Sequence, residues 1–168
     1  MTSYTISEAN RMDKGNFVQA FGAVFEETPQ IAERTWAAKP FKGIEDLHQK
    51  MVSAVEGGMT HDEKLKLIKS HPELGAKGKM AVASVQEQAS AGLNQIAQEE
   101  QQQIYQLNAA YQEKFGFPFV MAVKGQSLKN ILTGLETRLS NSVENEMVRS
   151  LSEIYKIARF RLDDLLID

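Results

Sequence analysis

Apolar side chains recur every three or four residues along almost the whole sequence. The clearest repeat lies near the end of the chain and comprises Met147, Leu151, Ile154, Ala158, Arg161 and Leu165. Positions at this spacing share one face of an α-helix. Similar repeats at 17–25, 31–36 and 44–55 predict helices earlier in the chain. A chain with this pattern is restricted to a mostly helical fold.

Capping and turn-forming residues divide these repeats into about eight helices, several of them short. Thr28 and Pro29 predict an N-cap and a first-turn proline, and Thr60 with Glu63 has the form of a capping box. Later helices are predicted at 82–91, at 95–115, after Ser127 and after Ser142. The expected fold class is all-α, in a single domain over residues 1–168, and the short helices exclude a simple four-helix bundle.

The composition excludes several function classes. The chain has no cysteine, so disulfides, thiolate catalysis and cysteine-ligated metals are excluded. A net charge of −3 gives no reason to expect binding to nucleic acid or to an anionic membrane. No apolar run is long enough to span a membrane, and residues 1–10 lack the apolar core of a signal peptide. We therefore expect a cytoplasmic protein.

His71 is the first candidate for chemistry. Pro72 disfavours the helical conformation for the residue before it, so His71 should leave the preceding helix in an extended conformation. Gly75 then permits a turn. A rigidly held imidazole suits proton transfer. A helix stop followed by an incidental surface histidine is the alternative interpretation.

Arg161 is the one charged position on the apolar face of the last predicted helix. A fully buried arginine is strongly destabilising without an anionic partner. Arg161 therefore closes an internal ion pair, reaches the surface near the chain end, or points into a pocket that receives an anion. Arg159 lies off this face and is expected to be solvated.

Two further segments could contact a ligand. Ser84, Glu87 and Gln88 share one helix face, which suits a polar heterocycle rich in amides, although Ser84 and Glu87 also have the form of a capping box. Phe117–Val123 breaks the helical pattern and is too apolar for an ordinary exposed loop, so we expect it to be extended and buried. Its backbone could bind a ligand where helix or sheet leaves it unpaired, with core filling as the compatible alternative. No two histidines have metal-binding helical spacing, so a metal site is disfavoured.

Several short motifs occur in a characteristic order: Phe17–Glu26, Lys39-Pro40-Phe41 before Asp46-Leu47-His48, His71–Gly75, Ser84-x-x-Glu87-Gln88 before Ala91-Gly92-Leu93, Phe115–Phe119, Arg138-Leu139-x-Asn141, and Arg161-Leu162. In these motifs the sequence resembles, over nearly its whole length, the 2-oxo-4-hydroxy-4-carboxy-5-ureidoimidazoline (OHCU) decarboxylases of urate breakdown. Two positions depart from the family pattern: Gln30 replaces a common tryptophan, and Glu73 replaces the usual aspartate after His-Pro.

The resemblance implies an all-α, cofactor-free enzyme, usually a homodimer, that converts OHCU to (S)-allantoin and CO2. It implies that His71 is the catalytic acid/base, that Glu87 is its catalytic companion, and that Arg161 binds an anion. The implied substrate pocket is lined by Pro72, Ser84, Val85, Gln86, Glu87 and Gln88, and by the backbone of Phe119, Val120, Met121, Ala122 and Val123.

Two other functions remain open from the residues alone. A non-catalytic helical binding module explains the capped amphipathic helices equally well, but it does not explain an arginine on a core face together with His71. A metal-free hydrolase of a ureido or hydantoin ring would need His71 and Glu87 to activate water directly.

Overall fold

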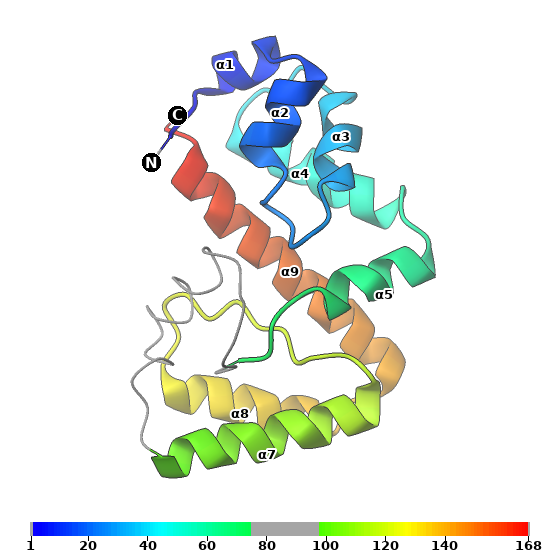
Figure 1. Cartoon of the computed structure of the whole chain (residues 1–168), viewed down its shortest axis with the longest axis vertical. Helices are drawn as coiled ribbons and strands as arrows, with labels where there is room; N and C mark the ends of the chain where they lie inside the picture. The colour runs from blue at the N-terminus through cyan, green and yellow to red at the C-terminus, as the bar shows by residue number, and fades with distance from the viewer. Residues whose placement is uncertain (1, 75–97, 168) are drawn as a thin grey trace. The chain divides into compact units, whose positions relative to one another are not determined.

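The structure is a computed structural model that describes residues 2–74 and 98–167. The helices in these ranges are α1 (Ile6–Arg11), α2 (Lys14–Phe21), α3 (Gln30–Trp36), α4 (Ile44–Glu56), α5 (His61–Lys69), α7 (Gln98–Phe115), α8 (Leu128–Arg138) and α9 (Val143–Leu165) (Figure 1). Within the described ranges the only β-type pairing is an isolated bridge between Tyr4 and Leu166. The prediction of an all-α fold is confirmed, and the helix predicted at 82–91 lies outside the described residues.

The chain divides into two compact units, which we call the first unit (Met1–Leu67 and Tyr155–Asp168) and the second unit (Ile68–Ile154). The chain passes from one unit to the other within α5 and again within α9. The single domain expected from the sequence stays a prediction.

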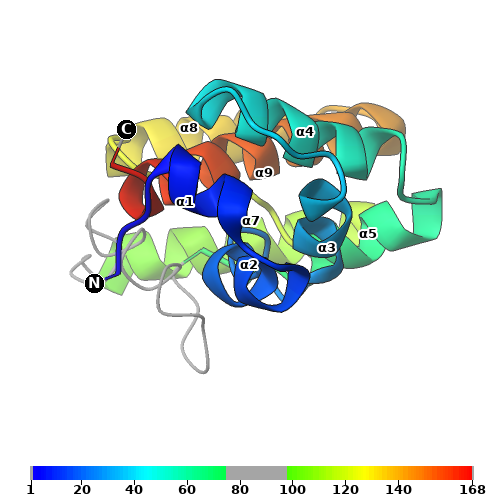
Figure 2. The ribbon, with the colours of Figure 1, turned by 90° about the horizontal axis from the view of Figure 1, so that it is seen from above.

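The first unit is built on α2, α3 and α4, with α3 packed beside both of the others (Figures 1 and 2). Aromatic side chains fill its core: the Phe17 ring lies 4.8 Å from that of Phe21 and 5.7 Å from that of Phe41. The two ends of the chain meet in this unit, because Tyr4 donates its N–H to Leu165 O and accepts one from Ile167.

One predicted helix start in the first unit is confirmed and one is wrong. The capping box exists: the Thr60 N–H donates to Glu63 Oε1 at 3.0 Å, and the Glu63 N–H donates to Thr60 Oγ1 at 3.2 Å. By contrast, α3 begins one residue later than predicted, with Pro29 and not Thr28 at the N-cap position. The Thr28 hydroxyl donates to Glu26 O at 2.7 Å, so it stabilises the preceding turn instead of capping the helix.

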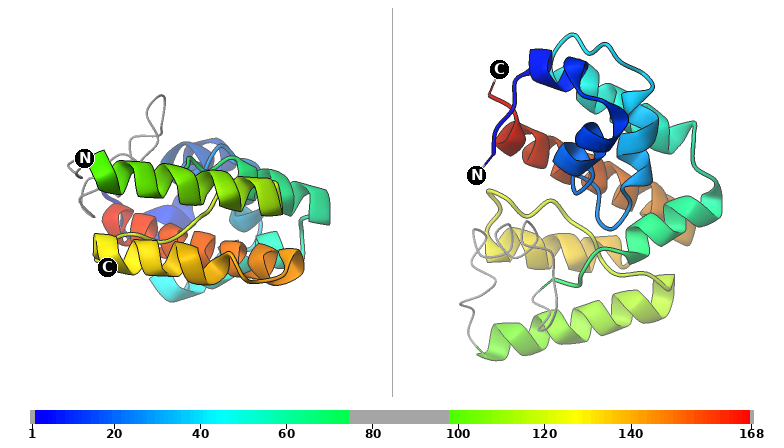
Figure 3. Two further views of the ribbon diagram at one scale, coloured as in Figure 1. Left: turned by 90° about the horizontal axis from the view of Figure 1, so that it is seen from below. Right: turned by 45° about the horizontal axis from the view of Figure 1, so that its top comes forward.

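In the second unit, α7 and α8 lie side by side and run in the same direction (Figure 3). Gly116 ends α7 with a φ of 78°, a left-handed conformation that glycine adopts without steric cost. The segment from Phe117 to Val123 then returns without helix or strand toward the start of α8, and every one of its residues except the half-buried Met121 is buried. The prediction of a buried, extended segment is confirmed. Ser127 accepts the Asn130 N–H at 3.1 Å and caps α8, also as predicted.

Candidate active site

His71 lies just beyond the end of α5, separated from Lys69 by Ser70 alone and followed by Pro72. Its N–H donates to Ile68 O at 3.2 Å, which closes the last turn of the helix. The residue is only 7% exposed, so the alternative of an incidental surface histidine is wrong. The structure therefore provides a buried imidazole held by a turn before it and a proline after it, an arrangement that suits proton transfer.

The segment Phe119–Val123, in the same unit as His71, already uses part of its backbone internally. Val120 O accepts a hydrogen bond from Arg138 Nη1 at 2.7 Å, and the Ala122 N–H donates to Glu153 Oε1 at 3.1 Å. Val123 O accepts the Gln126 N–H at 2.9 Å in the following turn. These three backbone groups are therefore not available to a substrate. The substrate contacts predicted for the segment can involve only its other N–H and C=O groups.

Arg138 anchors a buried polar network that sequence reasoning did not identify as part of a site. Its Nε lies 2.8 Å from Glu146 Oε1, and its Nη2 donates to Ser150 Oγ at 3.3 Å. Glu146 is fully buried and also accepts hydrogen bonds from Tyr111 Oη and from Asn141 Nδ2. The guanidinium carbon of Arg138 lies 4.4 Å from the centre of the Phe119 ring, a cation–π contact.

A sequence signal for this network existed. Ile131, Leu135 and Arg138 share one helix face, so Arg138 follows two core positions at the same spacing that draws attention to Arg161. The Tyr111 phenol is protonated within this network: burial raises its pKa, and the hydrogen bond to Glu146 raises it further.

Arg161 lies in the first unit, is 6% exposed, and pairs with a buried glutamate. Its Nη2 lies 2.9 Å from Glu26 Oε1, and its Nη1 donates to Ala23 O at 3.4 Å and to Val24 O at 3.3 Å. Of the three interpretations from sequence, the internal ion pair is therefore present and the surface-reaching side chain is wrong. That Arg161 also binds an anion stays a prediction. Arg159 is partly exposed and pairs with Asp163, in agreement with its predicted solvation.

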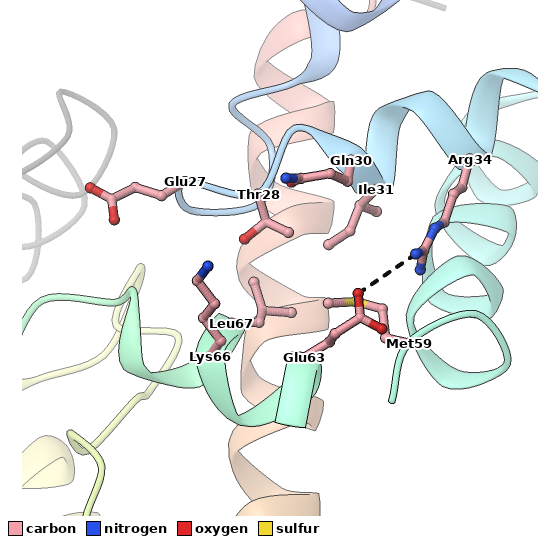
Figure 4. Close-up of a pocket in the computed structure, with 9 residues that line it drawn as sticks. All are labelled: Glu27, Thr28, Gln30, Ile31, Arg34, Met59, Glu63, Lys66 and Leu67. Carbon is pink, nitrogen blue, oxygen red and sulfur yellow. Dashed lines mark ion pairs between the residues drawn. The ribbon is translucent and has the colours of Figure 1, made fainter. Parts of the chain in front are cut away.

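A separate pocket of about 150 Å³ lies within the first unit, between the start of α3 and α5 (Figure 4). Lys66 and an ion pair at 3.7 Å between Arg34 Nη2 and Glu63 Oε2 contribute its charged walls. None of the predicted site residues lines this pocket, so it is not the predicted substrate site.

The remaining predicted site residues, Ser84, Val85, Gln86, Glu87 and Gln88, lie outside the described residues. In residues 2–74 and 98–167 no three His, Asp or Glu side chains are grouped so that they could hold a metal ion. Over the same ranges, no helix is both long and apolar enough to cross a membrane.

The all-α fold and the buried histidine agree with the class of protein that the sequence motifs suggest. Residues 10–163 match the family model described as OHCU decarboxylase, and the chain belongs to this family.

The chain is similar over nearly its full length to named members of the family. It is 40% identical over 167 residues to 2-oxo-4-hydroxy-4-carboxy-5-ureidoimidazoline decarboxylase of Halalkalicoccus jeotgali, an alignment that covers 99% of this chain and 94% of the relative. It is 42% identical over 163 residues to the uric acid degradation bifunctional protein PucL of Bacillus subtilis, covering 97% of this chain but 33% of that longer protein.

Solved structures show the same fold. A crystal structure of (S)-allantoin synthase superposes with a TM-score of 0.78 at 23% identity, covering 97% of this chain and 54% of the other. A crystal structure of OHCU decarboxylase in the presence of (S)-allantoin superposes with a TM-score of 0.71 at 19% identity, covering 92% and 98% of the two chains.

Proposed function

We propose that this protein is a carbon–carbon lyase that decarboxylates OHCU to (S)-allantoin and CO2 in urate breakdown. Membership of the family supports the reaction, and the buried, backbone-restricted imidazole of His71 is the observation that carries it. A homodimer in the cytoplasm, which the resemblance and the composition imply, belongs to the same proposal.

The proposed chemistry needs an acid and a rigid binding site. Breaking the bond to the carboxylate releases CO2 and leaves its electron pair on the substrate, where the ring carbonyl and nitrogens can hold the charge. The protein then has to orient the ring, balance its charge and deliver one proton to one face of the carbon. His71 supplies this proton in the proposed mechanism.

The other two groups act on charge and orientation. Glu87 fixes and polarises either the His71 imidazole or a polar group of the ligand. Arg161 binds an anionic oxygen of the substrate, and Glu26 beside it reduces the excess positive charge that the bound anion meets.

The product carbon is stereogenic, so a chiral assay tests the proposal directly. With freshly generated substrate, the protein should produce optically active allantoin and CO2 faster than spontaneous decay. The matched control is His71→Asn, which keeps a polar side chain but cannot transfer the proton. Because a positioned acid contributes about 10² to 10⁴ in rate, kcat should fall by a similar factor with little change in binding.

Three results would count against the proposal: racemic allantoin at the background rate, near-wild-type turnover by His71→Asn, or ring opening without CO2 release. The last result would favour the hydrolase. Light scattering of the purified protein tests the homodimer separately.

A further inference from the structure

Two charged side chains hold one edge of the segment Phe119–Val123. Arg138 of α8 donates to Val120 O, and Glu153 of α9 accepts the Ala122 N–H. In an extended chain, the polar backbone groups of alternate residues point to the same edge. The backbone polar groups of Val120 and Ala122 therefore face Arg138 and Glu153. The N–H and C=O of Met121 face the opposite edge of the segment.

The described part of the chain supplies no hydrogen-bond acceptor to the N–H groups of Met121 and Val123 on that opposite edge. Within residues 2–74 and 98–167, no group accepts a hydrogen bond from the N–H of Met121 or of Val123, although Val123 is buried and Met121 is half-buried. Buried N–H groups in folded proteins almost always have a partner, which is water or a ligand where protein supplies none. The edge that faces away from Arg138 and Glu153 is thus suited to bind amide-like oxygens.

Both of the charged side chains are themselves fixed. Glu146 holds the Nε of Arg138 at 2.8 Å, and Arg149 Nε holds the second carboxylate oxygen of Glu153 at 3.1 Å. Glu153 is 2% exposed, so its carboxylate has little freedom to turn toward solvent. Side chains whose own orientation is locked in this way hold the groups they bind within narrow limits.

We propose that Arg138 and Glu153 are positioning residues of the decarboxylase, an assignment that rests on the proposed function. They fix one edge of Phe119–Val123 so that the Met121 and Val123 edge meets the oxygens of the ureidoimidazoline. Neither side chain touches the substrate; both act through the backbone. A misplacement of about 1 Å in such a site can cost about 10² in rate, so loosening this edge should be visible in kinetics.

Three substitutions of Glu153 separate positioning from simple stability. Glu153→Gln keeps an oxygen that can accept the Ala122 N–H, and we expect kcat/KM within about threefold of wild type because an amide oxygen is also a good acceptor. Glu153→Asp keeps the charge but withdraws the oxygen by one methylene, and Glu153→Leu removes it. Both should raise the KM by about tenfold, as expected for one lost hydrogen bond of about 1.4 kcal/mol.

Ile131→Val is the matched control, because Ile131 is a buried residue of α8 whose side chain has no polar contact with the segment. It should lower the melting temperature and leave the KM unchanged. Hydrogen–deuterium exchange of the peptide spanning 117–127 gives a readout that needs no activity: exchange should be faster in Glu153→Asp and Glu153→Leu than in Glu153→Gln.

The outcomes are distinguishable. An unchanged KM in both Glu153→Asp and Glu153→Leu would overturn the assignment, as would a Glu153→Gln variant as impaired as Glu153→Leu. If Glu153→Leu does not fold, Glu153→Asp and the exchange measurement still test the positioning role of Glu153. A wild-type protein without decarboxylase activity would overturn the proposed function itself, whereas a failed KM prediction in an active enzyme overturns only the positioning role.

Discussion

Each of the two units contains an arginine that is almost fully buried, pairs with a buried glutamate and donates to at least one backbone carbonyl. In the first unit Arg161 pairs with Glu26, which is 135 positions away in the sequence. In the second unit Arg138 pairs with Glu146, which is 8 positions away across the turn between α8 and α9. The physical problem of burying a guanidinium is solved in the same way in both places.

The surroundings of the two pairs differ. Glu146 lies in the first turn of α9 and is held by Tyr111 and Asn141, so its carboxylate cannot leave the core without moving a helix. Glu26 lies in the turn between α2 and α3, outside any helix. An arginine on an apolar helix face is thus not by itself a sign of function. The surroundings of its glutamate partner decide how much stability is lost when the arginine is removed.

The largest effect expected from this comparison is on stability in the second unit. Arg138→Met should lower the free energy of unfolding by about 3–5 kcal/mol, because it leaves the Glu146 carboxylate buried without its cation. Urea denaturation measures this loss. The double variant Arg138→Met/Glu146→Leu should recover much of it, and a double variant as unstable as the single one would show that the pair is not the cause.

The second prediction concerns the corresponding change in the first unit. Arg161→Met should leave the protein folded, with a smaller stability loss than Arg138→Met, and should raise the KM for the anionic substrate at least about tenfold through loss of a charged hydrogen bond. Circular dichroism and steady-state kinetics on the same preparation test both parts. An unfolded Arg161→Met, or a folded one with wild-type KM, would show that Arg161 serves the fold and does not bind the substrate.

A third, smaller effect is expected from the carboxylate next to Arg161. Glu26→Gln keeps a hydrogen-bond acceptor for the guanidinium but removes the negative charge that balances it. If Arg161 binds an anion, affinity for an anionic substrate analogue should rise by about twofold to tenfold, as expected from removing a nearby like charge. Calorimetric titration measures this change, and weaker binding would contradict the proposed role of Arg161.

The exposed ion pair between Arg34 and Glu63 should have the smallest effect on stability. It provides a reference for the two buried ion pairs. The Thr60 N–H is the main cause that lowers the pKa of Glu63 below its ordinary value of 4.5, and Arg34 contributes less. Because the folded-state pKa is the lower one, this stabilisation is present above pH 4.5 and is lost as the pH falls through the folded-state pKa.

Arg34→Met should therefore leave the melting temperature at neutral pH almost unchanged. Glu63→Gln should weaken the pH dependence of unfolding below about pH 4.5. Thermal melts between pH 3 and pH 7 check both variants, and a large loss of stability in Arg34→Met would remove the contrast between exposed and buried pairs.

Local chemistry made much of the fold predictable. The capping box of Thr60 and Glu63, the cap at Ser127 and the buried segment after Gly116 depend on residues that are close in sequence, and all three are confirmed. The Thr28 cap was wrong because the hydroxyl has a competing carbonyl at Glu26 within the same turn. A sequence pattern cannot decide between two local partners of similar strength.

The sequence by itself determined the all-α class, the family, the proline-fixed exit of His71 from its helix and the presence of an arginine on an apolar face. These follow from periodicity and from steric rules that act over a few residues. Only the tertiary structure decided that Glu26 neutralises Arg161, and that Arg138 and Glu153 hold the backbone of Phe119–Val123. Such pairings depend on which side chains the packed helices bring within hydrogen-bonding distance, and no local rule encodes that choice.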